Sequence, residues 1–260
     1  MISRFSGTVV WLALTVFFVA ACGQGGRTEE GVGVRHPLID SGFVIPDYAA
    51  AAIEASGGRQ AWTRAEKLAL TCVVTFYRED GSFYLTEQRH EIHPLLNSIR
   101  ISGKEPQGEL VWRLSAEGLC SISEGVAVAD TSPQVNCSIA HAVLSVTTAA
   151  MRLSGRGTRL ARGSQPVRIE GLWYYPIERG GTEEMQAGSP RPEGIFYQNA
   201  ENFLVDTIYF RDPSMVVRGY DYKEVEKGGV LVPTKIEVFK SDRGGVLRER
   251  LAKIDYYRPG

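Results

Sequence analysis

The 260-residue sequence lacks an excess of charge of either sign, because 29 Lys and Arg residues stand against 30 Asp and Glu residues. Nucleic-acid binding requires clustered basic residues that neutralise phosphates. The basic residues here alternate with acidic ones, as in the segment 223–227 (KEVEK). This alternation is typical of a solvated mixed surface and argues against a nucleic-acid partner.

Motifs of enzyme active sites are also lacking. The sequence contains no nucleophile-elbow glycine pattern, no Gly-rich phosphate loop and no two-cysteine metal knuckle. His90 and His93 form an H-x-x-H pattern that could hold a metal on a helix, but in a strand the two imidazoles face opposite sides of the sheet. We therefore expect both to be surface residues, and we predict a non-catalytic protein without metal or cofactor.

No apolar run reaches the roughly 20 residues that a transmembrane helix needs. The run from Thr8 to Ala21 follows Arg4 and has about 14 residues, the length of a signal-peptide hydrophobic region. Residues 19–22 (VAAC) resemble the lipobox of bacterial lipoproteins, in which small residues admit the peptidase and the cysteine thiolate receives the diacylglyceryl group. An ordinary cleaved signal peptide with an incidental cysteine is the alternative.

The lipobox interpretation divides the chain into three parts. We predict a signal peptide over 1–21, a lipidated Cys22 with a Gly-rich flexible tether over 22–45, and one domain over 46–260. By resemblance to lipoproteins of two-membrane bacteria, Gly23 in place of an aspartate after the cysteine implies the outer membrane. The expected location is the cell envelope, with the domain facing the periplasm.

Three further cysteines remain after Cys22. Export places them in an oxidising compartment, where disulfides persist. Cys120 and Cys137 flank a turn-rich segment and are the favoured pair, although the other pairings and three free thiols stay open. Cys72 lies on an apolar strand face and is predicted to be a small buried hydrophobic residue.

The remaining pattern predicts two short helices followed by strands in hairpin order. Asp47 can cap a first helix that ends at Gly57-Gly58, and a second helix is expected over 59–67. An Ala-rich interior helix is expected over 138–153 and a long loop over 178–194. Strands are predicted at 68–77, 83–92, 98–102, 109–114, 118–123, 167–175, 203–210, 216–225, 230–239 and 246–257. These elements indicate an α+β fold with a curved antiparallel sheet.

The order of the elements resembles the LolA/LolB-like group of lipoprotein-sorting carriers and receptors of the bacterial envelope. The likeness covers most of 47–258 and is carried by the segment 55–58 (ASGG) with Ala61-Trp62 before the first strand, by the interior helix, and by the closing strand 229–236 (GVLVPTKI) with its hairpin. The resemblance implies an incomplete β-barrel with covering helices and an apolar cavity for lipid or for the acyl chains of lipoproteins.

Eight apolar residues are the predicted lining of such a cavity. They are Trp62, Phe76, Trp112, Trp173, Tyr175, Ile208, Phe210 and Ile236. The alternative is that the same residues fill a solid core, in which case the protein would bind a protein partner through its loops, 178–194 especially. The sequence therefore predicts a membrane-anchored lipid-binding protein, with a structural or interaction lipoprotein as the second possibility.

We expect Cys22→Ala to move the protein from the membrane fraction to the soluble periplasmic fraction. Each buried methylene contributes about 0.8 kcal/mol, so the loss of two or three acyl chains removes a stable anchor. Cell fractionation followed by immunoblotting measures the change. Unaltered retention of the variant in the membrane would contradict the lipobox interpretation.

Overall fold

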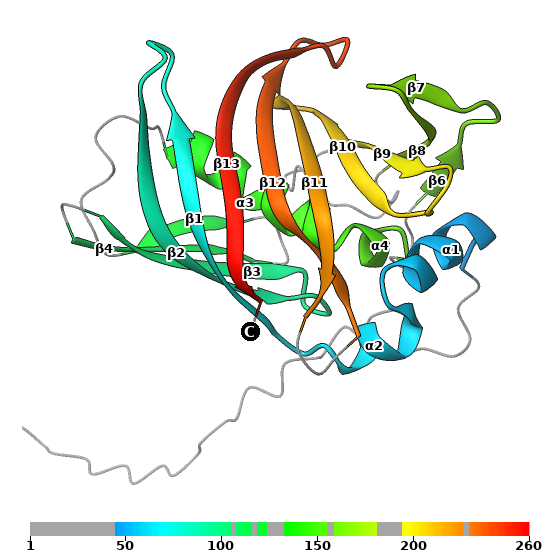
Figure 1. Cartoon of the computed structure of the whole chain (residues 1–260), viewed down its shortest axis with the longest axis horizontal. Coiled ribbons are helices and arrows are strands. Elements are labelled where there is room, and N and C mark those ends of the chain that lie inside the picture. Colours follow the sequence, from blue (N-terminus) through cyan, green and yellow to red (C-terminus); the bar gives the residue numbers. More distant parts are fainter. Residues whose placement is uncertain are drawn as a thin grey trace, which may run out of the picture. The chain divides into compact units, whose positions relative to one another are not determined.

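An antiparallel sheet organises the chain in the computed structural model (Figure 1). The structure describes residues 45–105, 108–115, 119–123, 133–154, 159–180, 194–225 and 229–259, so the predicted signal peptide, Cys22 and the predicted tether up to 44 lie outside the described residues. The helices are α1 (Asp47–Ala55), α2 (Gly58–Arg64), α3 (Pro133–Thr147) and α4 (Ala149–Arg152). The strands are β1 (Leu68–Tyr77), β2 (Phe83–His93), β3 (Ser98–Glu105), β4 (Gly108–Leu114), β5 (Cys120–Ser123), β6 (Arg159–Arg162), β7 (Val167–Ile169), β8 (Leu172–Gly180), β9 (Gly194–Asn199), β10 (Val205–Arg211), β11 (Ser214–Glu224), β12 (Leu231–Ser241) and β13 (Leu247–Pro259).

The strand order brings the two ends of the domain together at the middle of the sheet. The order is β5-β4-β3-β2-β1-β13-β12-β11-β10-β9-β8-β6, with β7 added beside β8. Within the described segments β5 and β6 are the two ends of this order and do not pair with each other. The sheet is therefore curved but unclosed, which confirms the predicted fold class.

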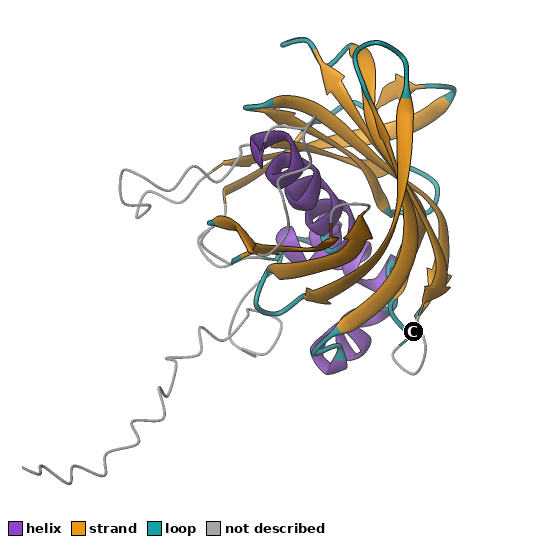
Figure 2. Ribbon diagram, turned by 90° about the vertical axis from the view of Figure 1, so that its left-hand side faces the viewer, coloured by secondary structure: helices purple, strands orange, loops and turns teal. Residues whose placement is uncertain are grey.

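Helix α3 occupies the concave side of the sheet (Figure 2). It contacts β3 and β4 on one flank and β10, β11 and β12 on the other. Ala142, Val143 and Leu144 are completely buried, and α4 adds the buried Met151. Residues 142–147, the last turns of α3, are all buried, and such a segment needs apolar or small residues on every face. Each fully buried Val, Leu or Met contributes about 1.5–3 kcal/mol of transfer free energy.

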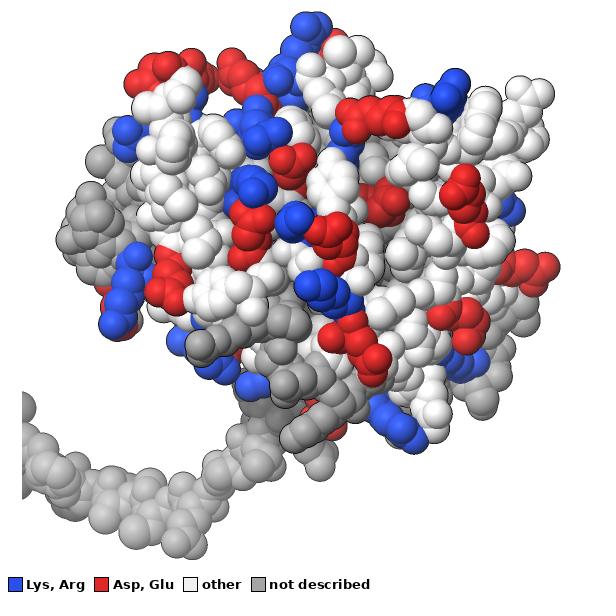
Figure 3. All heavy atoms as spheres, in the orientation of Figure 1, with Lys and Arg blue, Asp and Glu red and all other residues white. Residues whose placement is uncertain are grey.

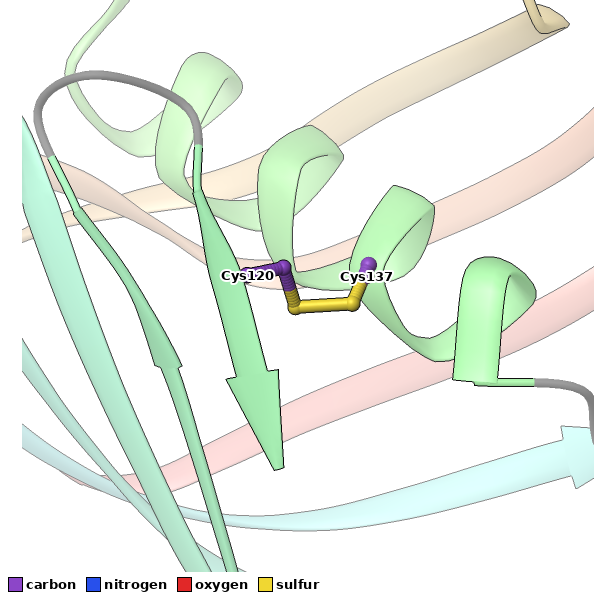
Figure 4. Close-up of a disulfide and its surroundings, with 2 residues drawn as sticks. All are labelled: Cys120 and Cys137. Carbon is purple, nitrogen blue, oxygen red and sulfur yellow. A yellow bond between two sulfur atoms is a disulfide. The ribbon is translucent and has the colours of Figure 1, made fainter. Parts of the chain in front are cut away.

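One covalent bond ties α3 to the edge of the sheet. Cys120 of β5 and Cys137 in the first half of α3 form a disulfide, the pairing that the sequence analysis favoured (Figure 4). Cys72 on β1 is a free, buried cysteine. The disulfide therefore connects the shortest strand of one sheet end directly to the central helix.

The interior helix α3 runs from Pro133 to Thr147, so it begins and ends earlier than the predicted helix over 138–153, and α4 follows after a break. Thr148 separates α3 from α4, and its hydroxyl donates a hydrogen bond to the Leu144 carbonyl at 2.6 Å. Such a bond from a β-branched side chain back to the preceding turn often bends a helix. Among the described residues no helix is both long and apolar enough to span a membrane.

The predicted single strand over 167–175 is wrong, since this segment is a β-hairpin. Glu170 and Gly171 both have positive φ, 48° and 92°, and Ile169 pairs with Leu172 across them. Two central residues with positive φ are typical of the tight turn that matches the twist of flanking strands. The sequence signal was missed because Glu is a rare residue at such a turn.

Several other elements differ from the prediction. Strands β6 and β9 were not predicted, and most of the predicted loop 178–194 lies outside the described residues. Phe203, predicted to begin a strand, has a φ of 60° and belongs to the turn between β9 and β10. Its amide donates to the Asn199 carbonyl at 3.0 Å, which closes that turn.

We expect the double variant Cys120→Ala/Cys137→Ala to lose about 3 kcal/mol of unfolding free energy. The bond closes a loop with a sequence separation of 17, and opening it restores conformational entropy to the unfolded chain. Urea unfolding with and without reductant measures the loss. Wild type and Cys72→Ala should both be destabilised by reductant, whereas a reductant effect on the double variant would refute the assignment.

Candidate functional site

A recess of about 780 Å³ opens at one end of the curved sheet. It lies where β1 ends, β11 begins and β12 passes into β13, and the start of α3 borders it. Its apolar lining comes from Val135 of α3, Met215 of β11 and Leu251 of β13, all packed against the hydrophobic core. We call this site, with these residues and the charged groups described next, the mouth recess.

Charged side chains of both signs form the rim of the mouth recess. Arg250 lies 3.1 Å from the Glu237 carboxylate, and its guanidinium stacks over the rings of Tyr77 and Phe239 at 5.5 and 5.4 Å. Its hydrogen bond to the Tyr77 hydroxyl raises the pKa of Arg250, which keeps the positive charge. This cation is therefore held in one orientation at the opening.

Lys240 is a second cation on the same rim, and its ion pairs are longer than that of Arg250. Lys240 lies 3.8 Å from both Glu79 and Glu249, and all three side chains are exposed. Exposed pairs of this kind contribute at most about 1 kcal/mol. Lys240 can therefore exchange these partners for a bound anionic oxygen at little cost.

Six of the eight predicted lining residues lie in the closed core instead of at the recess. The six are Trp62, Phe76, Trp112, Ile208, Phe210 and Ile236, each at most 2% exposed. They pack with the helices in one continuous hydrophobic cluster, and none of them borders the mouth recess. In the described part of the chain, α3 takes up the space that an open half-barrel would leave.

The other two predicted lining residues lie outside that core. Trp173 is 49% exposed because the turn at Glu170-Gly171 carries the start of β8 away from the buried face, so its prediction on a buried strand face is wrong. Tyr175 is half-buried under the guanidinium of Arg162, which lies 3.8 Å from its ring centre. The structure therefore does not bring the eight residues together.

The recess residues themselves were missed by the sequence analysis. Val135 precedes the predicted helix, and Met215 precedes the predicted strand at 216. Arg78 directly follows β1, whereas Lys240 and Arg250 belong to the hairpin of β12 and β13 near the other end of the domain. No periodic pattern marks such a site, since it is assembled from separate turns that only the sheet order brings together.

The prediction that His90 is a surface residue is wrong. It lies on the buried face of β2, and burial lowers the pKa of its imidazole to about 3, so the ring is neutral. Its Nδ1 lies 2.7 Å from the Tyr256 hydroxyl and its Nε2 lies 3.1 Å from Gln88 Oε1. Because Gln88 uses its amide nitrogen to donate to Thr86, Nε2 carries the proton and Nδ1 accepts from Tyr256.

The same cluster contains the free thiol. Cys72 Sγ lies 3.6 Å from His90 Nε2 and 3.6 Å from the Gln88 carbonyl, to which the thiol donates. Burial raises the pKa of Cys72, so the thiolate that a nucleophile requires is not formed. We interpret the cluster as a buried hydrogen-bonded chain of structural character. His93, the second histidine of the H-x-x-H pattern, is outside this cluster. It is half-buried, and its Nδ1 lies 3.2 Å from the carbonyl oxygen of Glu66.

Asp206 of β10 is a half-buried carboxyl group with a raised pKa. It accepts hydrogen bonds from Thr207 at 2.9 Å and from Tyr174 at 3.3 Å. Burial raises the pKa of Asp206 to about 6, and burial together with the Asp206 charge raises the pKa of Tyr174 to about 12. In the residues described here no three His, Cys, Asp or Glu side chains form a group that could hold a metal.

Comparisons with known proteins find similarity in solved structures only. No protein-family model matches the sequence, and no curated protein matches it. A LolA superfamily protein from Nitrosomonas europaea is 12% identical, with a TM-score of 0.47, covering 83% of this chain and 92% of that one. A DUF1329 family protein from Desulfovibrio piger is 10% identical, with a TM-score of 0.45 and coverages of 82% and 92%.

A third similar structure is a domain named for outer membrane lipoprotein sorting, from Vibrio parahaemolyticus. It is 9% identical, with a TM-score of 0.41, covering 80% of this chain and 91% of that one. At identities of this size no site residue is transferred from these structures to the present chain.

We expect Asp206→Asn to raise the free energy of unfolding by about 3 kcal/mol at pH 7.5. The pKa of about 6 in the folded state lies above the ordinary value of 3.8, so ionisation of Asp206 costs stability as the pH rises between these values. The gain should fall to about 1 kcal/mol at pH 4.5. Urea unfolding at both pH values measures it.

Asp221→Asn is the matched control. The pKa of Asp221 is lowered by its hydrogen bond and ion pair with Lys235, the opposite direction, so this variant should gain no stability at pH 7.5. Equal stability of Asp206→Asn and wild type at pH 7.5 would show that the carboxylate is not penalised in the fold.

Proposed function

We propose that this chain is a lipid-anchored protein of the bacterial envelope whose mouth recess binds an amphiphile, such as the acyl chain of a lipid or lipoprotein together with its polar head. The observation that carries the proposal is the recess itself, an apolar floor under a charged rim. Its volume of about 780 Å³ lies within the 300–1,000 Å³ that is usual for small-ligand sites.

The floor supplies the affinity for methylene groups. Val135, Met215 and Leu251 come from three different elements and present an apolar surface that a hydrocarbon chain can cover. Removal of apolar surface from water contributes about 25 cal/mol per Å², without directional contacts. Such a floor binds acyl chains of varied structure.

The rim supplies the preference for a polar head. Arg250 and Lys240 can bind carboxylate or phosphate oxygens, and charge-assisted hydrogen bonds are stronger than neutral ones. Glu249 and Asp80 on the same rim disfavour heads that are wholly anionic and suit heads that carry both signs. The mixed rim therefore favours zwitterionic or singly anionic amphiphiles.

Helix α3 limits how far a chain can enter. Its first half forms a wall of the recess through Val135 and is bonded to β5 through Cys137. Beyond this wall the concave face is closed by fully buried residues such as Val143 and Leu144. We propose that the bound chain stays at the mouth and does not thread through the sheet.

The filled concave face also supports a second candidate function. A sheet whose inner face is covered by its own helices can serve as a rigid support for loops that contact a protein partner. This interaction lipoprotein would take up no lipid. The two candidates therefore differ in one measurable property.

Uptake of a fluorescent fatty acid by the purified mature chain with Cys22→Ala tests the proposal. We expect Val135→Glu to weaken binding at least 10-fold, which corresponds to about 1.4 kcal/mol, because it places a carboxylate on the apolar floor. Leu96→Glu is the matched control, since Leu96 is exposed in the turn between β2 and β3 and should leave binding unchanged.

Two other outcomes would contradict part of the proposal. No uptake by the unsubstituted chain would contradict lipid binding and favour the interaction lipoprotein. Uptake that Val135→Glu leaves unchanged would contradict the mouth recess as the site.

A further inference from the structure

Three basic side chains from separate elements gather on one flank of α3. They are His141 of α3, Arg152 of α4 and Arg179 of β8, and all three are half-buried. We call them the cationic cluster. Among the described residues that line the mouth recess, none belongs to this cluster. The cationic cluster is therefore a second concentration of charge, separate from the rim of the recess.

The strand register places Arg179 on the inner face of the sheet. Ile177, two residues earlier on β8, is fully buried in the core, and alternate residues of a strand share a face. Glu178 between them is exposed on the opposite face, where it pairs with Arg211 at 3.3 Å. The charge of Arg179 therefore lies on the same side of the sheet as α3 and α4.

A glycine leaves space between Arg179 and the next large side chain of this face. Arg179 pairs with Gly194 of β9, and Gly194 pairs with Phe210 of β10. A Cβ atom added at Gly194 would lie 3.5 Å from Cδ1 of Phe210, so the space over the glycine borders that ring. Because neighbouring strands are about 4.8 Å apart, an arginine side chain that extends over Gly194 can reach the ring of Phe210.

His141 lies on the other side of the same ring. Its imidazole contacts Phe210 edge to face, with 5.1 Å between the ring centres, and both α3 and α4 contact β10. Burial and the charges of Arg152 and Arg179 hold the pKa of His141 well below its usual range. A position at which positive charges disfavour a proton is one at which they favour an anion.

The outward charges of the domain are arranged differently. On the face of the molecule shown in Figure 3, basic side chains lie beside acidic ones. Examples are the ion pairs of Lys235 with Asp221 and of Arg250 with Glu237. Among the described groups, the charges that act on His141 are those of the two arginines. The cationic cluster is therefore a region of one sign in a protein whose total charge is close to zero.

The donors of the cationic cluster match a phosphate group. A guanidinium presents five N–H donors in a planar fork, and two forks with one imidazole can bind several oxygens of a tetrahedral anion at once. A carboxylate has only two oxygens to offer. Arg152 and Arg179 also make other interactions within the protein, and the number of their donors allows a bound anion in addition.

We propose that the cationic cluster is a binding site for a phosphate group, either free or carried by the head of a lipid. Arg152 and Arg179 bind the phosphate oxygens, and His141 donates one further hydrogen bond. The site does not depend on the lipid uptake proposed for the mouth recess, because its residues and its ligand chemistry are different.

Nuclear magnetic resonance of the histidine side chains tests the proposal on the mature chain with Cys22→Ala. We expect inorganic phosphate, added at constant pH, to shift the imidazole signals of His141, which the variant His141→Gln assigns. His93 is the internal control, because it ends β2 at the opposite end of that strand from the mouth recess, and its signals should not move.

Calorimetric titration with inorganic phosphate tests the two arginines. We expect Arg152→Gln and Arg179→Gln each to weaken phosphate binding at least 10-fold. Arg211→Gln is the matched control, because Arg211 follows Phe210 directly but is exposed on the opposite face, and it should bind as the parent does. Equal phosphate affinity in Arg179→Gln and Arg211→Gln would overturn the site. All variants are first shown to unfold cooperatively in urea.

A water-soluble phospholipid separates the two sources of the phosphate. If dihexanoyl phosphatidylglycerol binds more tightly than inorganic phosphate, and Val135→Glu removes the difference, the phosphate belongs to a lipid head beside the mouth recess. Equal affinities of the two probes assign the site to free phosphate. If neither probe shifts the His141 signals of the parent chain, the proposal is overturned. Uptake of fatty acid, which has no phosphate, tests the mouth recess alone.

Discussion

The packing of α3 into the concave face is the interaction on which the rest of this structure depends. A curved sheet with an apolar inner face must cover that face, and here the buried second half of α3 does so with residues such as Ala142 and Leu144. Because the helix fills the inside, space for a ligand remains at the ends of the sheet. The mouth recess exists where the first turn of α3 meets the strand ends.

The core also contains a line of hydrogen-bonded polar side chains. On β2 the buried face carries Thr86, Gln88 and His90, which hydrogen-bond in a line that ends at Tyr256. Burying a polar group without a partner costs free energy, and these hydrogen bonds offset that cost for the four side chains. The mouth recess lies outside this hydrogen-bonded line, at one end of the sheet.

Much of the fold could be predicted because it is local. The alternation from Leu68 to Phe76 and the turn-rich segment 241–245 between β12 and β13 are patterns of neighbouring residues, and both elements were found. The failures concern the hairpin of β7 and β8, the short β6, and β9. Strands β6 and β9 have only 4 and 6 residues, too few to show a clear alternation, and the hairpin has a turn residue of unusual type.

By itself the sequence determined the class of fold, the apolar strand faces and the interior helix, because periodicity and spacing record which side chains avoid water. It favoured the pairing of Cys120 with Cys137 without excluding the others. Only the tertiary structure decided that this helix fills the sheet, that His90 is buried, and that Trp173 is exposed. Whether an apolar side chain lines a cavity, fills a core or faces outward depends on what packs against it. The residues that pack against such a side chain come from elsewhere in the chain, so a local sequence pattern does not identify them.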